Sequence, residues 1–195
     1  MSNLFSHLKS ITQPQHDQLE AVSFAKEIIS QKISLSDYLQ LLDKTAVIYQ
    51  FFEPMVNQFI TQHQDTRFTP FISHRLSDVE KDLANFTNYK KEDRLVIGSN
   101  QKVESLPDLI GVLYVLEGAR LGGKVIVKAL RKNPALADIG EFQFYQQTGI
   151  ETRQRWLDFR ALAEEGVVDE EGRKRATRSA QATFDLFYRV HRLNN

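Results

Sequence analysis

Apolar positions recur along most of the chain at the three- to four-residue spacing of amphipathic helices. We find no convincing stretch in which apolar and polar residues alternate with the period of two that marks a half-buried strand. Nine glycines and five prolines are few turn-forming residues for 195 positions. The pattern therefore predicts an all-α protein. Because no linker, repeat or low-complexity tract divides the chain, we expect one domain over residues 1–195.

Three helix starts carry a capping signature, in which a Ser or Thr is followed three residues later by an acid or amide. They are Thr12-x-x-Gln15, Ser34-x-x-Asp37 and Ser105-x-x-Asp108. Pro14 and Pro107 fit the first turns of two of these helices, where the missing N–H does little harm. From the second and third starts the pattern predicts helices over about 35–60 and 106–131. Elsewhere it predicts helices over 72–88, 150–165 and 171–193, a polar loop over 89–104, and a loop with a short helix over 132–149.

The helix predicted over 106–131 contains three glycines, Gly118, Gly122 and Gly123, among residues that favour a buried helix. Each glycine in a helix interior costs about 1 kcal/mol relative to alanine. Residues four apart share a helix face, so Tyr114, Gly118 and Gly122 form one line of small surface with a phenol at its end. Either a closely packed helix or a flat ligand could use this surface. The third glycine favours the ligand, because helix packing seldom needs two glycines in succession.

Composition narrows the range of functions. Lys+Arg and Asp+Glu are equal at 25 each, so the basic excess of a nucleic-acid binder is missing. The absence of cysteine excludes disulfides, thiolate catalysis, Cys-ligated zinc and iron–sulfur clusters. The N-terminal residues lack the apolar core and cleavage site of a signal peptide, and no run approaches a membrane span. We expect a cytoplasmic, soluble protein with neither nucleic acid nor membrane as a partner.

One histidine stands out by its neighbours. The five histidines show neither the paired spacing of a zinc helix nor the repeated Glu-x-x-His of a di-iron bundle. His16, however, has Glu20 on the same face, where the carboxylate could accept a hydrogen bond from Nδ1–H and turn Nε2 outward as a metal ligand. Lys9 lies two turns earlier and shares that face if the helix continues through Pro14. A solvated helix surface would explain Glu20 and Lys9 equally well.

Taken together, these residues resemble the heme oxygenase family, especially its bacterial, biliverdin-producing branch. T-Q-P-Q-H-D-Q-L-E at 12–20 is similar to the family's Thr-x-x-x-His-x-x-x-Glu around the proximal haem ligand. L-Y-V-L-E-G-A-R-L-G-G at 113–123 is similar to its distal-helix signature. Weaker matches are F-Y-Q-Q-T-G, R-W-L-D-F-R-A-L and A-T-F-D-L-F, later in the chain. The resemblance implies a multi-helix heme oxygenase-like fold, with haem held between a proximal helix and a kinked distal helix.

The resemblance also implies residue roles. His16 would be the proximal iron ligand, with Glu20 behind it. Gly118 and Gly122 would lie over the distal face as catalytic positions, leaving space for iron-bound dioxygen. The remaining haem contacts implied are Lys9 and Tyr114 at the propionates, Phe184 at the haem edge, Ala119 on the distal side, and either Arg153 or Arg155 at a propionate.

The activity implied is oxidative cleavage of haem, which is both cofactor and substrate, by O2 to biliverdin, carbon monoxide and ferrous iron. Because no nucleotide or flavin motif is present, electrons would come from an external donor of reductase or ferredoxin type. Ala119 departs from the family pattern, since many animal-type members carry an aspartate there that organises distal water. Arg120 is expected to point away from the glycine face.

Other interpretations remain open. A non-catalytic haem-binding or storage protein on the same scaffold would tolerate Ala119. A thiaminase-type enzyme would need a cysteine or a carboxylate pair, and a helical interaction module would use the glycines for packing alone. The basic run R-K-R-A-T-R at 173–178 could dock an acidic electron donor, although such a run is more often a solvated helix face.

Overall fold

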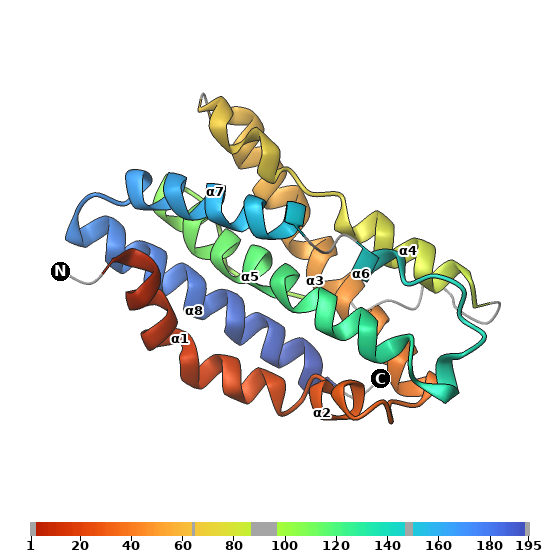
Figure 1. The fold of residues 1–195 in the computed structure, drawn as a ribbon. Coiled ribbons are helices and arrows are strands. Elements are labelled where there is room, and N and C mark those ends of the chain that lie inside the picture. Colours follow the sequence, from red (N-terminus) through yellow and green to blue (C-terminus); the bar gives the residue numbers. More distant parts are fainter. Residues whose placement is uncertain (1–2, 64, 87–96, 147–149, 194–195) are drawn as a thin grey trace.

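The computed structural model describes residues 3–63, 65–86, 97–146 and 150–193, and these residues contain helices and no strand (Figure 1). The all-α prediction is therefore confirmed. The α-helices are α1 (Leu4–Glu20), α2 (Ala25–Ile29), α3 (Leu35–Gln62), α4 (Arg75–Ala84), α5 (Leu106–Leu130), α6 (Gln143–Gln146), α7 (Ile150–Gly166) and α8 (Glu170–Arg192), with short 3-10 turns η1 (Thr66–Phe71) and η3 (Pro134–Leu136). None of these helices is long and apolar enough to cross a membrane.

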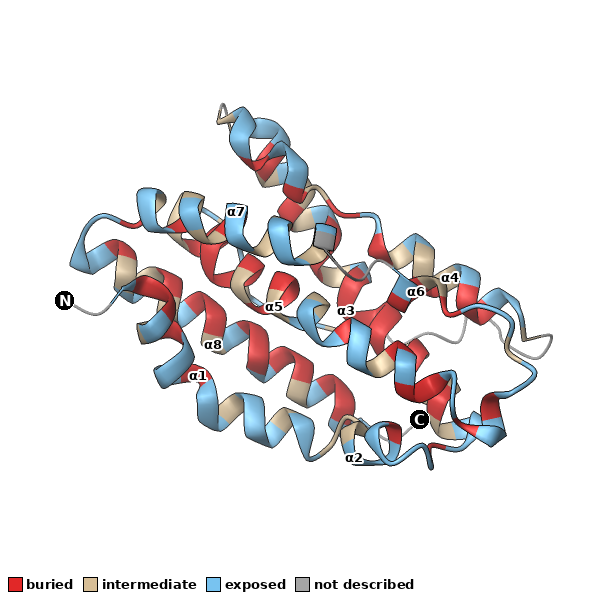
Figure 2. Ribbon diagram, viewed as in Figure 1, coloured by how far each residue is buried: buried red, intermediate tan, exposed pale blue. Residues whose placement is uncertain are grey.

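Helix α5 is the centre of the fold. It packs along α8 over most of its length and also contacts α7, α6 and α2, while α1 lies against α8 (Figure 1). The buried residues of α5 and α8 face the interior that these helices share with α3 (Figure 2). Leu109, Ile110 and Leu113 of α5 are fully buried there. The apolar residues that made this helix appear central in the sequence do form the core.

Two of the three predicted caps are confirmed. The Ser34 hydroxyl accepts the N–H of Asp37 at 3.1 Å, and the Ser105 hydroxyl accepts that of Asp108 at 3.4 Å. Helices α3 and α5 begin directly after these two serines, as the spacing predicts.

The cap predicted at Thr12 is wrong. Helix α1 begins eight residues earlier at Leu4, where the Asn3 side chain accepts the N–H of Ser6 at 2.8 Å. Thr12 is buried inside the helix, and its hydroxyl donates to the Leu8 carbonyl at 2.8 Å. The helix continues past Pro14 because burial of one face, including Leu4 and Leu8, outweighs the local penalty of an interior proline. One continuous helix therefore carries all of residues 4–20.

The other boundaries agree approximately with the prediction. Helices α4, α7 and α8 lie within or close to the predicted segments 72–88, 150–165 and 171–193, and 132–149 contains η3 and α6. Of the loop predicted over 89–104, residues 97–104 carry no helix, and the remainder lies outside the described residues. Helix α2 and turn η1 were not predicted, because both are too short to show a helical period.

Helices α5 and α8 approach each other closely at Gly111. A Cβ atom added there would lie 2.7 Å from Cβ of Ser179 and 2.9 Å from the backbone nitrogen of Ala180, and would collide with the Ala176 carbonyl oxygen. Real Cβ atoms essentially never come so near, so Gly111 is required for the two helices to pack. Helix packing thus uses a glycine that lies outside the Gly118–Gly123 segment.

Candidate functional site

Two adjoining cavities follow one another along α1 and α5, from Lys9 and Tyr114 towards the ends of both helices. The first cavity has a volume of about 490 Å³ and is lined by Lys9, Thr12, Gln13, His16, Leu19, Tyr114, Val115, Gly118, Ala119, Trp156, Phe184 and Phe187. The second cavity has a volume of about 340 Å³ and lies among α2, α3, α5 and α8. Leu19, Ala119 and Phe187 line both, so the two cavities form consecutive parts of one space.

His16 lies on the α1 wall of the first cavity. Its side chain is 50% exposed, and its ring centroid is 6.1 Å from that of Phe184 on α8. The continuous helix also carries Lys9 to the same cavity wall, as expected if α1 passes through Pro14. His16 is thus accessible both to the cavity and to solvent, and nothing packed against it prevents it from acting as a ligand.

The acceptor expected behind His16 is near but does not form a hydrogen bond in this structure. Nδ1 of His16 lies 3.7 Å from Oε1 of Glu20 and 3.8 Å from Oδ1 of Asp17, beyond hydrogen-bond length. Both carboxylates are more than 60% exposed. A rotation of the imidazole or of either carboxylate would be needed for Nδ1–H to donate. Asp17 is a second acceptor that the sequence pattern did not single out.

The glycine line of α5 is bare on the side of the cavities. A Cβ atom at Gly118 would meet only the Trp156 ring, at 3.8 and 3.9 Å, and one at Gly122 would meet only Ile126 of the same helix, at 3.9 Å. These are ordinary van der Waals distances. Among the described residues, no helix backbone approaches these two glycines as α8 approaches Gly111, so close packing of backbones does not explain them.

The residues expected at the other haem contacts gather around the first cavity. Lys9 is exposed there, Phe184 is buried, and Tyr114 is half-buried. Burial raises the pKa of Tyr114, partly offset by a hydrogen bond with the Thr12 hydroxyl. The phenol therefore keeps its proton at neutral pH, and an anion in the cavity would compete with the Thr12 oxygen for it. Ala119 lines both cavities and presents no carboxylate to either.

An aromatic wall of the first cavity escaped the sequence analysis. Trp156 of α7 lies next to Gly118, and its ring centroid is 5.3 Å from that of Phe5 and 6.1 Å from that of Tyr114. These rings come from three different helices. No local spacing in the sequence could have brought them together, although Trp156 stands within one of the weaker family-like segments.

A buried ion-pair network fixes α5 behind the glycines. Glu117, only 4% exposed, receives two hydrogen bonds from the Arg155 guanidinium, at 2.7 and 2.8 Å, and lies 3.6 Å from Nε of Arg120. Arg155 also donates to the Pro70 carbonyl of η1. This network ties α7 to α5 and so holds Trp156 beside Gly118.

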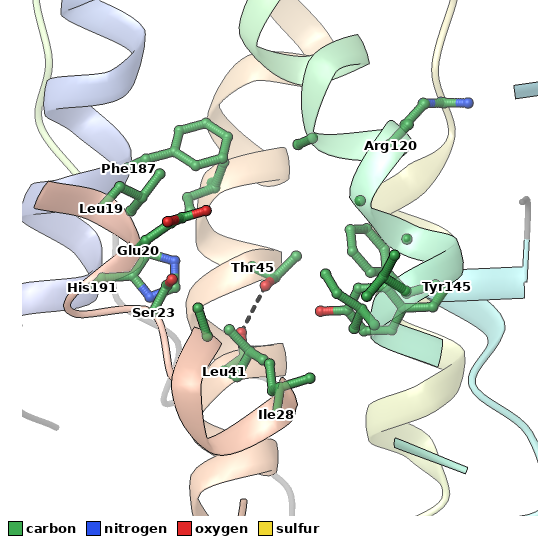
Figure 3. A pocket seen from close by; sticks show the side chains of 18 of the residues that line it. Leu19, Glu20, Ser23, Ile28, Leu41, Thr45, Arg120, Tyr145, Phe187 and His191 are labelled. Atoms are coloured by element: carbon green, nitrogen blue, oxygen red, sulfur yellow. Dashed lines mark hydrogen bonds between the residues drawn. The ribbon is translucent and has the colours of Figure 1, made fainter. Parts of the chain in front are cut away.

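The positions of three arginine side chains relative to the cavities follow from the structure. Arg155 is engaged with Glu117, and neither it nor the exposed Arg153 lines either cavity. Burial lowers the pKa of Arg120 and the Glu117 carboxylate opposes this. The Arg120 guanidinium lies near Glu117 and, at 3.5 Å, the Ser73 hydroxyl, and it points away from the other labelled residues of the second cavity (Figure 3).

The basic run at 173–178 is partly engaged within the chain. Arg175 forms an ion pair with Asp108 at 2.6 Å, and Arg178 pairs with Glu171 at 3.2 Å. The run is therefore not a uniformly free cationic surface.

Comparisons with known proteins identify the family of this chain. The family model described as "Heme oxygenase" matches residues 2–192. The chain belongs to the heme oxygenase family. A heme oxygenase of Xanthomonas campestris pv. campestris (strain 8004) is 38% identical over 79 residues, which are 40% of this chain and 46% of that protein. The match therefore spans less than half the length of that curated relative.

Solved heme oxygenases share the fold. The structure of heme oxygenase from Leptospira interrogans superimposes with a TM-score of 0.77 at 17% identity, covering 97% of this chain and 98% of that one. Heme oxygenase-1 from the cyanobacterium Synechocystis sp. PCC6803, in complex with heme, gives a TM-score of 0.75 at 17% identity, covering 97% and 91%. At such identities the likeness establishes the fold, and residue roles rest on this chain's own geometry.

Proposed function

We propose that this heme oxygenase-family chain binds haem in the two cavities and cleaves it with O2 and reducing equivalents to biliverdin, carbon monoxide and ferrous iron. The observation that carries the proposal is the bare backbone of Gly118 and Gly122 on the α5 wall of a space whose α1 wall holds His16. A flat plate can lie against such a wall, and dioxygen needs room that a side chain would occupy. When bound, haem itself supplies the oxygen-activating chemistry.

The protein's part would be to hold and orient the plate. His16 is the candidate iron ligand, and Glu20 or Asp17 is near enough to take up its Nδ1–H after a small rotation. Lys9 and the protonated Tyr114 phenol, together in the first cavity, suit the two propionates. Phe184 would pack at the plate's edge. Because its propionates would be held at one end, the haem could take only one rotational orientation in its plane between α1 and α5.

Proton supply would rely on water and backbone groups on the distal side. Ala119 offers no acidic group, and the Arg120 guanidinium is directed to Glu117 and Ser73. Electrons would come from a separate donor of reductase or ferredoxin type in the cytoplasm.

A titration with hemin followed by reduction tests the proposal. Trp156 is the only tryptophan of the chain and lines the first cavity, so bound hemin is expected to quench its fluorescence as the Soret band grows. Addition of ascorbate or a reductase under air should then convert the Soret band into the absorption of biliverdin, with release of carbon monoxide. If hemin causes neither quenching nor a Soret shift, a helical interaction module is the better interpretation.

Ala119 favours a second candidate, a haem-binding or storage protein on the same scaffold. Without a distal carboxylate the chain could retain haem and fail to cleave it. The two candidates differ in the reduction step alone: a storage protein would quench Trp156 and form a Soret band that persists when ascorbate and air are added.

A further inference from the structure

His191, in the last turn of α8, is a buried histidine to which the proposed function assigns no role. It is 8% exposed and lines the second cavity. Figure 3 draws it beside Glu20 and Ser23, on the side of the cavity opposite Arg120 and Tyr145. His191 therefore lies beyond His16 along the space, at the end away from Lys9.

One nitrogen of the imidazole lacks a partner. Nδ1 of His191 is buried and forms no hydrogen bond with any described residue. Burial lowers the pKa of His191 to about 4, and the positive charge of Lys44 acts in the same direction, so the ring is neutral at neutral pH. Lys44 binds only the backbone of this residue, donating from Nζ to the His191 carbonyl at 2.9 Å. A buried ring nitrogen without a partner is costly, and a polar group of the cavity's occupant that reached Nδ1 would remove that cost.

Two other polar groups of the second cavity are already engaged within the chain. The Thr45 hydroxyl, also in the second cavity, donates to the Leu41 carbonyl at 2.7 Å (Figure 3). The Arg75 guanidinium has unpaired nitrogens as well, but it lies 3.9 Å above the Phe144 ring, whose face partly compensates its charge. Of the described polar residues that line the second cavity, Arg75 and His191 have buried side-chain atoms without a hydrogen bond, and His191 is the neutral one.

The position of His191 identifies the kind of partner. With its propionates at Lys9 and Tyr114, haem would turn its opposite edge towards the second cavity, because the two cavities are consecutive along α1 and α5. That edge of haem bears only carbon groups and offers nothing to an imidazole. Once the ring is opened at this edge, each broken end becomes a lactam with a C=O and an N–H, and either tautomer of His191 can pair with it.

We propose that His191 is a product-recognising residue, whose imidazole forms a hydrogen bond with a lactam group of biliverdin at the ring edge furthest from the propionates. The inference rests on the proposed function. It makes His191 a determinant of product affinity, with no part in holding intact haem, and it implies that opening occurs at the meso bridge facing the second cavity.

The test compares the affinities of hemin and biliverdin, each titrated separately and followed by Trp156 fluorescence. The variants are His191→Leu, which removes the hydrogen bond, and His191→Asn, which keeps a polar group near the Nδ1 position. His74→Leu, at an exposed histidine outside both cavities, is the control. We expect His191→Leu to weaken biliverdin binding about five- to tenfold, the effect of one hydrogen bond, with hemin affinity unchanged within about twofold. His191→Asn should recover most of the loss.

Infrared difference spectra provide an independent readout. The lactam bands of biliverdin bound to the wild-type protein should be shifted relative to those in the His191→Leu complex. If His191→Leu weakens the binding of hemin and of biliverdin equally, His191 only shapes the cavity wall. If the affinity for biliverdin is unchanged, His191 forms no hydrogen bond with biliverdin. Either result overturns the inference. Both leave haem binding by the wild type intact, whereas failure of the wild type to bind hemin rejects the proposed function itself.

Discussion

At the scale of single residues, the candidate site contains both exposed side chains on α1 and buried side chains on α5 and α8. His16 and Lys9 are accessible on α1, whereas Glu117 and His191 are buried behind or beyond the glycine wall. The sequence pattern located the accessible residues through their spacing on one helix. It could not locate His191 or Trp156, because their relation to the cavities depends on how α7 and α8 pack against α5.

Substitution of His16 tests the proximal ligand. Since the side chain is half exposed and makes no hydrogen bond among the described residues, His16→Ala should change the free energy of unfolding by no more than about 0.5 kcal/mol. After reduction to ferrous haem under nitrogen, the complex of the variant should lack the iron–histidine stretch that the wild type shows in its resonance Raman spectrum. His74→Ala is the matched control, and persistence of the wild-type stretch in His16→Ala would remove His16 from the ligand role.

At the scale of the helical elements, α5 uses its glycines in two different ways. Gly111 lets α8 approach so closely that a methyl group would collide with its backbone. Gly118 and Gly122 have room for a methyl group and face the cavities. The second pair stands out in the sequence, but spacing alone does not separate close packing from ligand access, because both need small residues on one face.

Alanine substitutions should separate the two uses by opposite effects on stability. Gly118→Ala and Gly122→Ala are each expected to stabilise the protein by about 0.5–1 kcal/mol, because alanine favours a helix and meets no close neighbour. Gly111→Ala should destabilise it by about 1–3 kcal/mol through overpacking. Chemical denaturation followed by circular dichroism measures all three. A destabilised Gly118→Ala variant would mean that this position serves packing after all.

At the scale of the whole molecule, burial of His191 couples folding to pH. Its pKa is lowered from 6.5 to about 4, so between these values the unfolded chain binds a proton that the folded protein does not. The contribution of the neutral ring is therefore fully present above pH 6.5 and is lost as the pH falls towards 4. The full loss amounts to about 3 kcal/mol, from about 1.4 kcal/mol for each unit of pKa.

Comparison of wild type and His191→Leu should reveal this coupling. We expect the wild type to lose about 3 kcal/mol more than the variant between pH 7 and pH 4, because leucine has no proton to gain. Denaturant unfolding at several pH values provides the difference and cancels contributions from other groups. Parallel pH profiles for the two proteins would show that His191 is protonated in the fold as readily as in the unfolded chain.

The sequence by itself determined the helical class, two of the three proposed caps, and which residues share a face on the two walls of the candidate site. These features depend on spacing within one helix, which fixes whether Lys9 and His16, or Tyr114, Gly118 and Gly122, share a face. It failed at Thr12, because local capping chemistry cannot reveal that burial of Leu4 and Leu8 extends α1 past Pro14. Only the tertiary structure decided which glycine carries helix packing, how Arg155 is engaged, and that His191 lines the second cavity. Each of these depends on residues distant in sequence, whose approach is set by the packing of several helices together.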